Sequence, residues 1–240
     1  MSFVDHLLVV LLFIAHPVYG YFESKRHEAR MQAGEVFDRL RFYRDTALAE
    51  WAFLAVLAAV WILYGRSAQE LGFVAAGGLG FGIGTGIVCL LVFYLFYAVS
   101  TSRRSNDAEK AKQVENIGKT ITFLPHTDRE LRGFYGVSIT AGIVEEIVYR
   151  GFVLWYLGHF MPLWAAVIVS SIAFGLAHGY QGASGALRCG LVGLAFGIVY
   201  VVTGSIWVPI LAHILLDAFQ GAAIRELLRS DGDSLDIQPA

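Results

Sequence analysis

The chain has 240 residues, of which 56% are hydrophobic and 16% are charged, whereas a soluble domain has about 25% charged residues. Apolar runs close to the roughly 20 residues that cross a bilayer occur at Phe3 to Tyr21, Thr46 to Tyr64 and Leu71 to Ser100, and again in the second half. These features exclude an ordinary cytosolic globule and predict an all-α polytopic membrane protein. The net charge is -2 and no long basic block is present, which excludes nucleic-acid binding.

The apolar windows predict a bundle of about seven transmembrane helices, with eight possible. The windows are residues 3–21, 46–64, 71–100, 132–157, 163–179, 186–203 and 205–221. The first window contains Asp5 and no Lys or Arg precedes it, so we interpret it as a retained span and not as a signal peptide. The third window is long for one helix, which can be tilted, extend out of the membrane or be broken into two pieces.

Two polar stretches, Phe22 to Asp45 and Thr101 to Leu131, contain most of the basic residues. Counted with Arg132, they contain 13 of the 18 Lys and Arg residues. Basic residues favour the cytoplasmic side of a membrane. We therefore expect both stretches in the cytoplasm, the N-terminus outside and the C-terminus inside, in the plasma (inner) membrane. Apolar residues at helical spacing predict interfacial helices within these stretches.

Five glycines alternate with other residues in the third window: Gly78, Gly80, Gly82, Gly84 and Gly86. A phosphate loop would need a preceding strand and a solvated helix start, whereas this run lies inside an apolar helix. Small residues at every fourth position let two transmembrane helices approach closely, so we interpret the glycines as a packing surface. Gly193 and Gly197 repeat the pattern.

Glu145, Glu146 and Arg150 lie in an apolar stretch, in the sequence GIVEEIVYRGF. A charged side chain at mid-membrane costs roughly 2.5 to 3.5 kcal/mol, so such residues are usually buried against partners. On a helix Glu146 and Arg150 share one face, whereas Glu145 points about 100° away. We therefore expect an ion pair between Glu146 and Arg150, and expect Glu145 to act as a general base. A structural salt bridge alone would leave one glutamate unexplained.

Two further clusters contain histidine: His178 follows Phe174 by four residues, and His213 precedes Asp217 by four residues. A single histidine at a helix end is usually an interfacial residue, and His213 with Asp217 could form a structural hydrogen bond. Separate clusters would each need their own buried partner, so the simpler prediction is that they partner one another. We expect Glu145, His178 and His213 to converge on one cavity.

The motifs EExxxR at 145–150, FxxxH at 174–178 and HxxxD at 213–217 together resemble the three motifs of the CPBP family, the CAAX proteases and bacteriocin-processing enzymes. The resemblance covers about residues 132–221. It implies a glutamate-type intramembrane endopeptidase similar to the Ras-converting CAAX protease, with no metal ion or other cofactor.

The resemblance also implies a role for each motif residue. Glu145 and His178 would activate water, and His213 and Asp217 would line the site and help to stabilise the oxyanion. The supporting residues would be Glu146, Arg150 and Phe174. The family more often has Asn at the position of Asp217, and an aspartate donates a hydrogen bond to an oxyanion only when it is protonated.

Other mechanisms remain open. Ser184 lies in the run GASG, which resembles the rhomboid nucleophile motif, although a turn is the simpler interpretation. Zinc held by Glu145, His178 and His213 is chemically reasonable, because two histidines and a carboxylate form a familiar catalytic set, although no HExxH is present. A non-enzymatic membrane immunity or binding protein, or a small transporter, would use the same cluster to hold a partner, a proton or an ion.

The sequence predicts three parts: residues 1–131 as a scaffold of transmembrane and interfacial helices, 132–221 as the CPBP-like catalytic core, and 222–240 as a polar, disordered tail. Four ionisable residues of the scaffold lie near a predicted interface and are interpreted as snorkelling or capping residues: Asp5, His6, His16 and Glu50. The expected partners are the lipid bilayer and a protein or peptide substrate that is lipidated or carries a leader or sorting sequence. The sequence does not identify that substrate.

Overall fold

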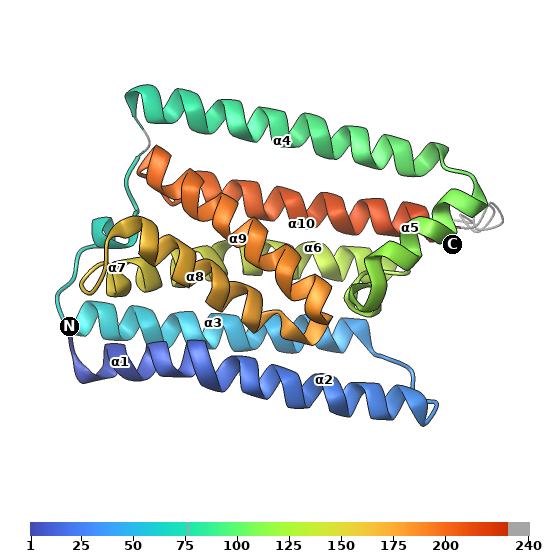
Figure 1. The fold of residues 1–240 in the computed structure, drawn as a ribbon, viewed down its shortest axis with the longest axis horizontal. Coiled ribbons are helices and arrows are strands. Elements are labelled where there is room, and N and C mark those ends of the chain that lie inside the picture. The colour runs from blue at the N-terminus through green and yellow to red at the C-terminus, as the bar shows by residue number, and fades with distance from the viewer. Residues whose placement is uncertain (76, 230–240) are drawn as a thin grey trace, which may run out of the picture.

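The computed structural model describes residues 1–75 and 77–229, and within them it contains helices and no strand. The long helices run along the longest axis of the molecule, with the start of α1 and the end of α10 at opposite ends of the bundle (Figure 1). This arrangement confirms the predicted all-α polytopic membrane fold. Of the tail predicted at residues 222–240, residues 222–227 are helical and belong to α10 (Trp207–Leu227), and residues 230–240 lie outside the described residues.

The first span is one helix that is longer than the predicted window. It consists of α1 (Phe3–Val10), the π-helical segment η1 (Leu11–Ala15) and α2 (His16–Gln32). The ring of a proline inside an α-helix clashes with the carbonyl group four residues earlier. For Pro17 that carbonyl belongs to residue 13, inside η1, so the wider π-helical turn accommodates the proline without ending the helix.

Asp5 confirms its predicted capping role and also has a partner that the sequence did not reveal. Its carboxylate accepts a hydrogen bond from the backbone of Ser2 at the start of α1. It also forms an ion pair with Arg66, with 2.6 Å between Nη2 and Oδ2. The Asp5 side chain is completely buried, so this pair ties the start of the first helix to the loop after α3 (Arg39–Leu63).

The third window is helical only from Gly78, because α4 spans Gly78–Arg104. The short helix η2 (Ala68–Leu71) ends at Gly72, whose φ of 84° is left-handed. The backbone that follows bonds to the loop before α10: Ile206 N–H donates to the Gly72 carbonyl at 2.9 Å, and Ser205 Oγ donates to the Val74 carbonyl at 2.7 Å. The predicted start at residue 71 is therefore wrong, since these residues are held outside the helix by bonds to a distant loop.

The polar stretch after α4 is largely helical, as predicted. It contains α5 (Asp107–Ile117) and η3 (Gly118–Phe123). Asn106 begins α5 with a capping box to Glu109. The position of this stretch at a membrane interface stays a prediction.

The second half contains the remaining helices. α6 (Asp128–Glu146), the π-helical η4 (Ile147–Val153) and α7 (Leu154–Leu157) form one continuous rod. They are followed by α8 (Leu163–Ala177), η5 (Gly179–Gln181), α9 (Ala183–Thr203) and α10 (Trp207–Leu227). Thr127 begins α6 with a capping box to Glu130.

Five helices in the described part of the chain are long and apolar enough to cross a membrane. They are Phe3–Gln32, Arg39–Leu63, Gly78–Thr101, Ala183–Thr203 and Trp207–Leu227. Two of the predicted spans fall outside this group: α8 is shorter, with 15 residues, and the rod formed by α6, η4 and α7 carries charged side chains. For these two, crossing of the membrane stays a prediction.

Within the described part of this chain, one face of the α4 glycine run packs against another helix or loop. A Cβ atom at Gly80 would lie 3.0 Å from the Thr203 carbonyl oxygen, and one at Gly84 would lie 3.0 Å from a methyl group of Val208. Cβ atoms at Gly82 and Gly86 would meet nothing within 4 Å. The packing interpretation is thus confirmed for Gly80 and Gly84, and for Gly82 and Gly86 it stays a prediction.

Candidate functional site

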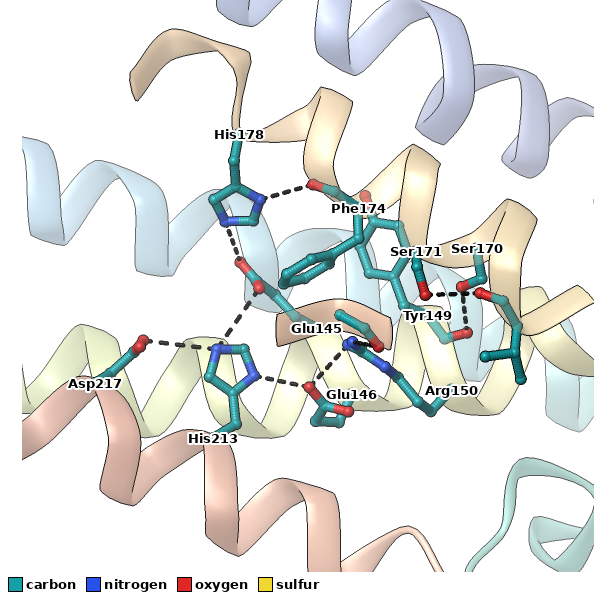
Figure 2. A network of polar contacts seen from close by, with 12 residues as sticks. Glu145, Glu146, Tyr149, Arg150, Ser170, Ser171, Phe174, His178, His213 and Asp217 are labelled. Atoms are coloured by element: carbon teal, nitrogen blue, oxygen red, sulfur yellow. Dashed lines mark hydrogen bonds and ion pairs between the residues drawn. The ribbon is translucent and has the colours of Figure 1, made fainter. Parts of the chain in front are cut away.

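Glu145 and Glu146 are the last residues of α6, and the π-helical segment η4 begins directly after them. π-Helical turns within α-helices are frequent at functional sites. Arg150 lies in this segment, and its Nη1 atom is 2.8 Å from Glu146 Oε1 (Figure 2). The predicted ion pair between Glu146 and Arg150 is confirmed, although the backbone between the two residues is π-helical.

Arg150 also joins η4 to α9. Its side chain is 2% exposed, and its Nη2 atom donates a hydrogen bond of 2.8 Å to the carbonyl oxygen of Gly193. The guanidinium carbon lies 4.7 Å from the ring centroid of Phe174, within range of a cation–π interaction. A Cβ atom at Gly193 would lie 3.0 Å from Phe174 and 3.3 Å from Arg150, which confirms the close packing expected at this glycine.

His213, on α10, binds the same oxygen of Glu146. Its Nδ1 atom is 2.8 Å from Glu146 Oε1, whereas its Nε2 atom is 3.6 Å from Asp217 Oδ2. The contact of His213 with Glu146 is therefore shorter than its contact with Asp217, the partner that sequence spacing suggested. Since a carboxylate can only accept a hydrogen bond, Nδ1 carries the proton, and this bond fixes the orientation of the ring.

His178 directly follows α8. Its Nδ1 atom lies 2.8 Å from the carbonyl oxygen of Phe174, which requires a proton on Nδ1. In the neutral ring Nε2 is then an acceptor, and this atom faces Glu145 (Figure 2). Phe174 thus orients His178 through its backbone and packs against Arg150 through its ring.

Glu145 lies between the two histidines. Its Oε1 atom is 3.9 Å from His178 Nε2, and its Oε2 atom is 3.9 Å from His213 Nε2 (Figure 2). These distances are too long for direct hydrogen bonds and suit contacts bridged by one water molecule. The structure thus brings together Glu145, His178 and His213 from three helices, with Asp217 beside His213.

Buried polar atoms without a partner gather around this cluster. Among the side chains that the structure describes, five buried nitrogen or oxygen atoms have no hydrogen-bond partner. They are Arg39 Nε, Glu50 Oε2, Glu145 Oε2, Glu146 Oε2 and the Tyr149 hydroxyl. Glu145 and Glu146 belong to the cluster, and the carboxyl of Glu50 and the hydroxyl of Tyr149 lie within electrostatic range of Glu145. Because buried polar groups are normally paired, this concentration indicates a site that binds polar atoms.

Glu50 corrects the sequence analysis, which interpreted it as a snorkelling or capping residue. Its Oε2 atom is buried, and its carboxyl lies within electrostatic range of His213 and Asp217 as well as Glu145. The predicted span began at residue 46, whereas α3 begins at Arg39. Glu50 therefore lies well inside the helix.

A cavity of about 460 Å³ lies beside the cluster and not within it. Its lining includes Lys119, Phe123 and Tyr180 but none of the residues Glu145, His178 and His213. The side chains predicted to share a cavity are therefore close together, but the cavity is adjacent to them. Tyr180 connects the two features, because its ring centroid lies 5.9 Å from that of His178. Burial raises the pKa of the Tyr180 hydroxyl well above its ordinary value, so this group stays neutral.

The two alternative mechanisms have different geometries. Ser184 lies exposed in the first turn of α9 and not in a connecting turn, which corrects the predicted location. In the described residues, no group of three or more His, Cys, Asp or Glu side chains is placed to hold a metal ion.

Comparisons with known proteins identify the segment that carries the cluster. Residues 129–219 match the family model described as Type II CAAX prenyl endopeptidase Rce1-like. Over 82 residues the chain is 33% identical to a protein of Bacillus subtilis (strain 168) described as "Putative membrane peptidase YdiL". That match covers 34% of this chain and 33% of the relative, so it spans about a third of the relative's length. No solved structure matches the chain.

Proposed function

Since residues 129–219 belong to the CPBP family of CAAX protease-like proteins, we propose that the chain is an intramembrane peptidase of the glutamate type. The proposal is that Glu145 and His178 activate a water molecule that hydrolyses a peptide bond of a membrane-associated protein. It rests on one observation above all: each oxygen of Glu145 faces the Nε2 atom of a different histidine at 3.9 Å.

Water activation follows from the two acceptors that face each other. A water molecule between Glu145 Oε1 and His178 Nε2 can donate one hydrogen atom to each of them. Its oxygen lone pair is then free to attack a carbonyl carbon, and Glu145 accepts the proton as the bond forms. The bond from His178 Nδ1 to the Phe174 carbonyl keeps Nε2 available as an acceptor.

In this proposal His213 and Asp217 stabilise the oxyanion. The bond from His213 Nδ1 to Glu146 holds the ring with Nε2 toward the cluster. A protonated His213 donates from Nε2, and in a site shielded from bulk water such a bond to a developing oxyanion is strengthened. Asp217 adds a second donor only when it is protonated.

The substrate is proposed from the family segment and the charge pattern. Figure 1 places the connections at the α2–α3, α4–α5 and α8–α9 junctions at one end of the bundle, the end with the basic polar stretches. By the positive-inside rule this end faces the cytoplasm, with the N-terminus outside. A prenylated CAAX protein, a leader-bearing peptide or a protein with a C-terminal sorting tail would each reach the cluster from that side.

The test begins with a substrate-trapping variant. Glu145→Gln keeps the shape of the side chain but removes the base, so substrates should bind without being cleaved, and mass spectrometry of the purified complex identifies them. The identified peptide is then incubated with wild-type protein and with Glu145→Gln. We expect cleavage by the wild type and a loss of at least about 100-fold in kcat in the variant. Full activity in Glu145→Gln would remove this residue from the mechanism.

Two further treatments separate the mechanisms. Activity should survive Ser184→Ala, because this hydroxyl lies exposed on α9. Activity should also survive dialysis against a chelator. Loss of activity in the chelated enzyme followed by recovery with added zinc would decide for a zinc peptidase and against water activation by Glu145 alone.

A further inference from the structure

A carboxyl group outside the matched segment belongs to the same cluster. Glu50 lies on α3, which packs side by side with α6 (Figure 1). The two helices are joined beside it by a hydrogen bond of 3.1 Å from Trp51 Nε1 to Thr140 Oγ1. This bond holds Glu50 near the part of α6 that leads to Glu145, and Glu50 lies within electrostatic range of Glu145, His213 and Asp217.

Glu50 differs from Glu146 in its environment. Glu146 accepts hydrogen bonds from Arg150 and His213, which balance its charge. Glu50 has a buried oxygen with no partner, and no ion pair to it occurs in the described part of the chain. The Glu50 side chain is only half-buried overall, but at its buried, unpartnered oxygen the charged form costs more free energy than the neutral acid. Glu50 is therefore the carboxyl group suited to hold a proton next to the water-activating glutamate.

We propose that Glu50 is the general acid that protonates the leaving amine, an inference that rests on the proposed peptidase function. The water oxygen bonds to the carbonyl carbon while Glu145 takes one water proton. As the C–N bond breaks, its electron pair takes the proton from Glu50, and a neutral amine leaves. The proton on Glu145 then passes to the Glu50 carboxylate, which restores both groups, so the net reaction is amide plus water to acid plus amine.

Leaving groups differ in how much they need such an acid. An amine leaves a tetrahedral intermediate only after protonation of its nitrogen. A thiolate leaves without a proton, because a thiol has a pKa of about 8.5. A general acid therefore accelerates amide cleavage and has little effect on cleavage of a matching thioester.

The experiment compares two probes on the full-length protein in lipid nanodiscs. The first is a farnesylated CAAX peptide, and the second is the same peptide with sulfur in place of the scissile nitrogen. We expect Glu50→Gln to lower kcat for the amide by about 100-fold and to leave kcat for the thioester within about 3-fold. Glu50→Asp keeps an acidic proton, so its kcat for the amide should be at least about 10-fold higher than that of Glu50→Gln.

Trp51→Phe is the matched control, because it removes the hydrogen bond to Thr140 beside Glu50 without removing an acid. It should change both rates by the same factor. The Glu50 proposal is overturned if Glu50→Gln cleaves the amide at the wild-type rate. That result would mean that Glu145 or His178 donates the proton to the leaving amine. It is also overturned if both rates fall equally, which would indicate a structural role. A wild-type protein that cleaves neither these probes nor the peptide identified with Glu145→Gln would overturn the proposed function and this role with it.

Discussion

Replacement of Arg150 by methionine tests the network that holds the two glutamates in place. The Arg150 side chain is 2% exposed and donates hydrogen bonds of 2.8 Å to Glu146 and to the carbonyl oxygen of Gly193. Methionine fills much of the same volume but carries no charge and no donor. In Arg150→Met the buried carboxylate of Glu146 is left with His213 as its hydrogen-bond partner.

The expected magnitude follows from the contacts that are lost. Removing one partner of a buried ion pair costs about 3 to 5 kcal/mol. The hydrogen bond to Gly193 contributes about 1.5 to 3 kcal/mol, and the contact with the Phe174 ring about 2 kcal/mol when desolvated. These contributions overlap and His213 still binds Glu146, so we expect Arg150→Met to lower the free energy of unfolding by about 3 to 5 kcal/mol and not by their sum.

A double variant separates the charge from the packing. In Arg150→Met with Glu146→Gln, the carboxylate that needs a cation is absent, so about 1 to 3 kcal/mol should be recovered. The measurement is equilibrium unfolding in mixed micelles, with the helical circular dichroism signal followed against the fraction of denaturing detergent. The reasoning would be refuted if Arg150→Met unfolded within 1 kcal/mol of the wild type, or if the double variant were less stable than the single one.

Three further predictions concern packing, chemistry and the distal ion pair. A Cβ atom at Gly175 would lie 2.7 Å from the Ala186 carbonyl oxygen, whereas one at Gly190 would meet no atom closer than 3.5 Å. Gly175→Ala should therefore lower the thermal unfolding midpoint, with a cost of about 1 to 3 kcal/mol, and Gly190→Ala should leave it unchanged; equal midpoints would contradict this. Asp217→Asn should retain or increase kcat, because asparagine is a permanent donor, and complete loss with the fold intact would show that the carboxylate is required. Arg66→Met should cost about 3 to 5 kcal/mol in detergent unfolding, because it leaves Asp5 buried and unpaired, and a wild-type midpoint would refute that role.

The sequence predicted the neighbours within each helix better than the contacts between helices. The spacing of Glu146 and Arg150 predicted their ion pair, because helix geometry alone brings residues four apart together. Contacts across helices depend on how each helix is rotated against the next. For that reason the Nδ1 atom of His213 was not expected to bind Glu146, and the bond from Arg150 to Gly193 was also missed.

The ends of the helices, like the contacts between helices, were predicted less well than the contacts within a helix. Hydropathy measures how apolar a segment is and does not distinguish a helix from an extended chain that is buried in the bundle. Residues 71–75 are apolar enough to join the third window, but the carbonyl groups of Gly72 and Val74 accept hydrogen bonds from Ile206 and Ser205 and lie outside a helix. Likewise, four-residue glycine spacing identifies two candidate faces of α4, and only the position of Thr203 selects Gly80 and Gly84 as the contact face.

Glu50 shows why position along a chain is a poor guide to burial in a helical bundle. Counted from the predicted span start at residue 46, it is an interfacial residue. In the structure α3 begins at Arg39, and Glu50 Oε2 is buried without a hydrogen-bond partner. A buried carboxyl oxygen needs a partner or a proton. The hydrogen bond between Trp51 and Thr140 holds Glu50 beside α6. The ionisation of Glu50 therefore depends on the charge of the neighbouring cluster. In this way a residue outside the segment that matches the family model takes part in the chemistry that we propose for that segment.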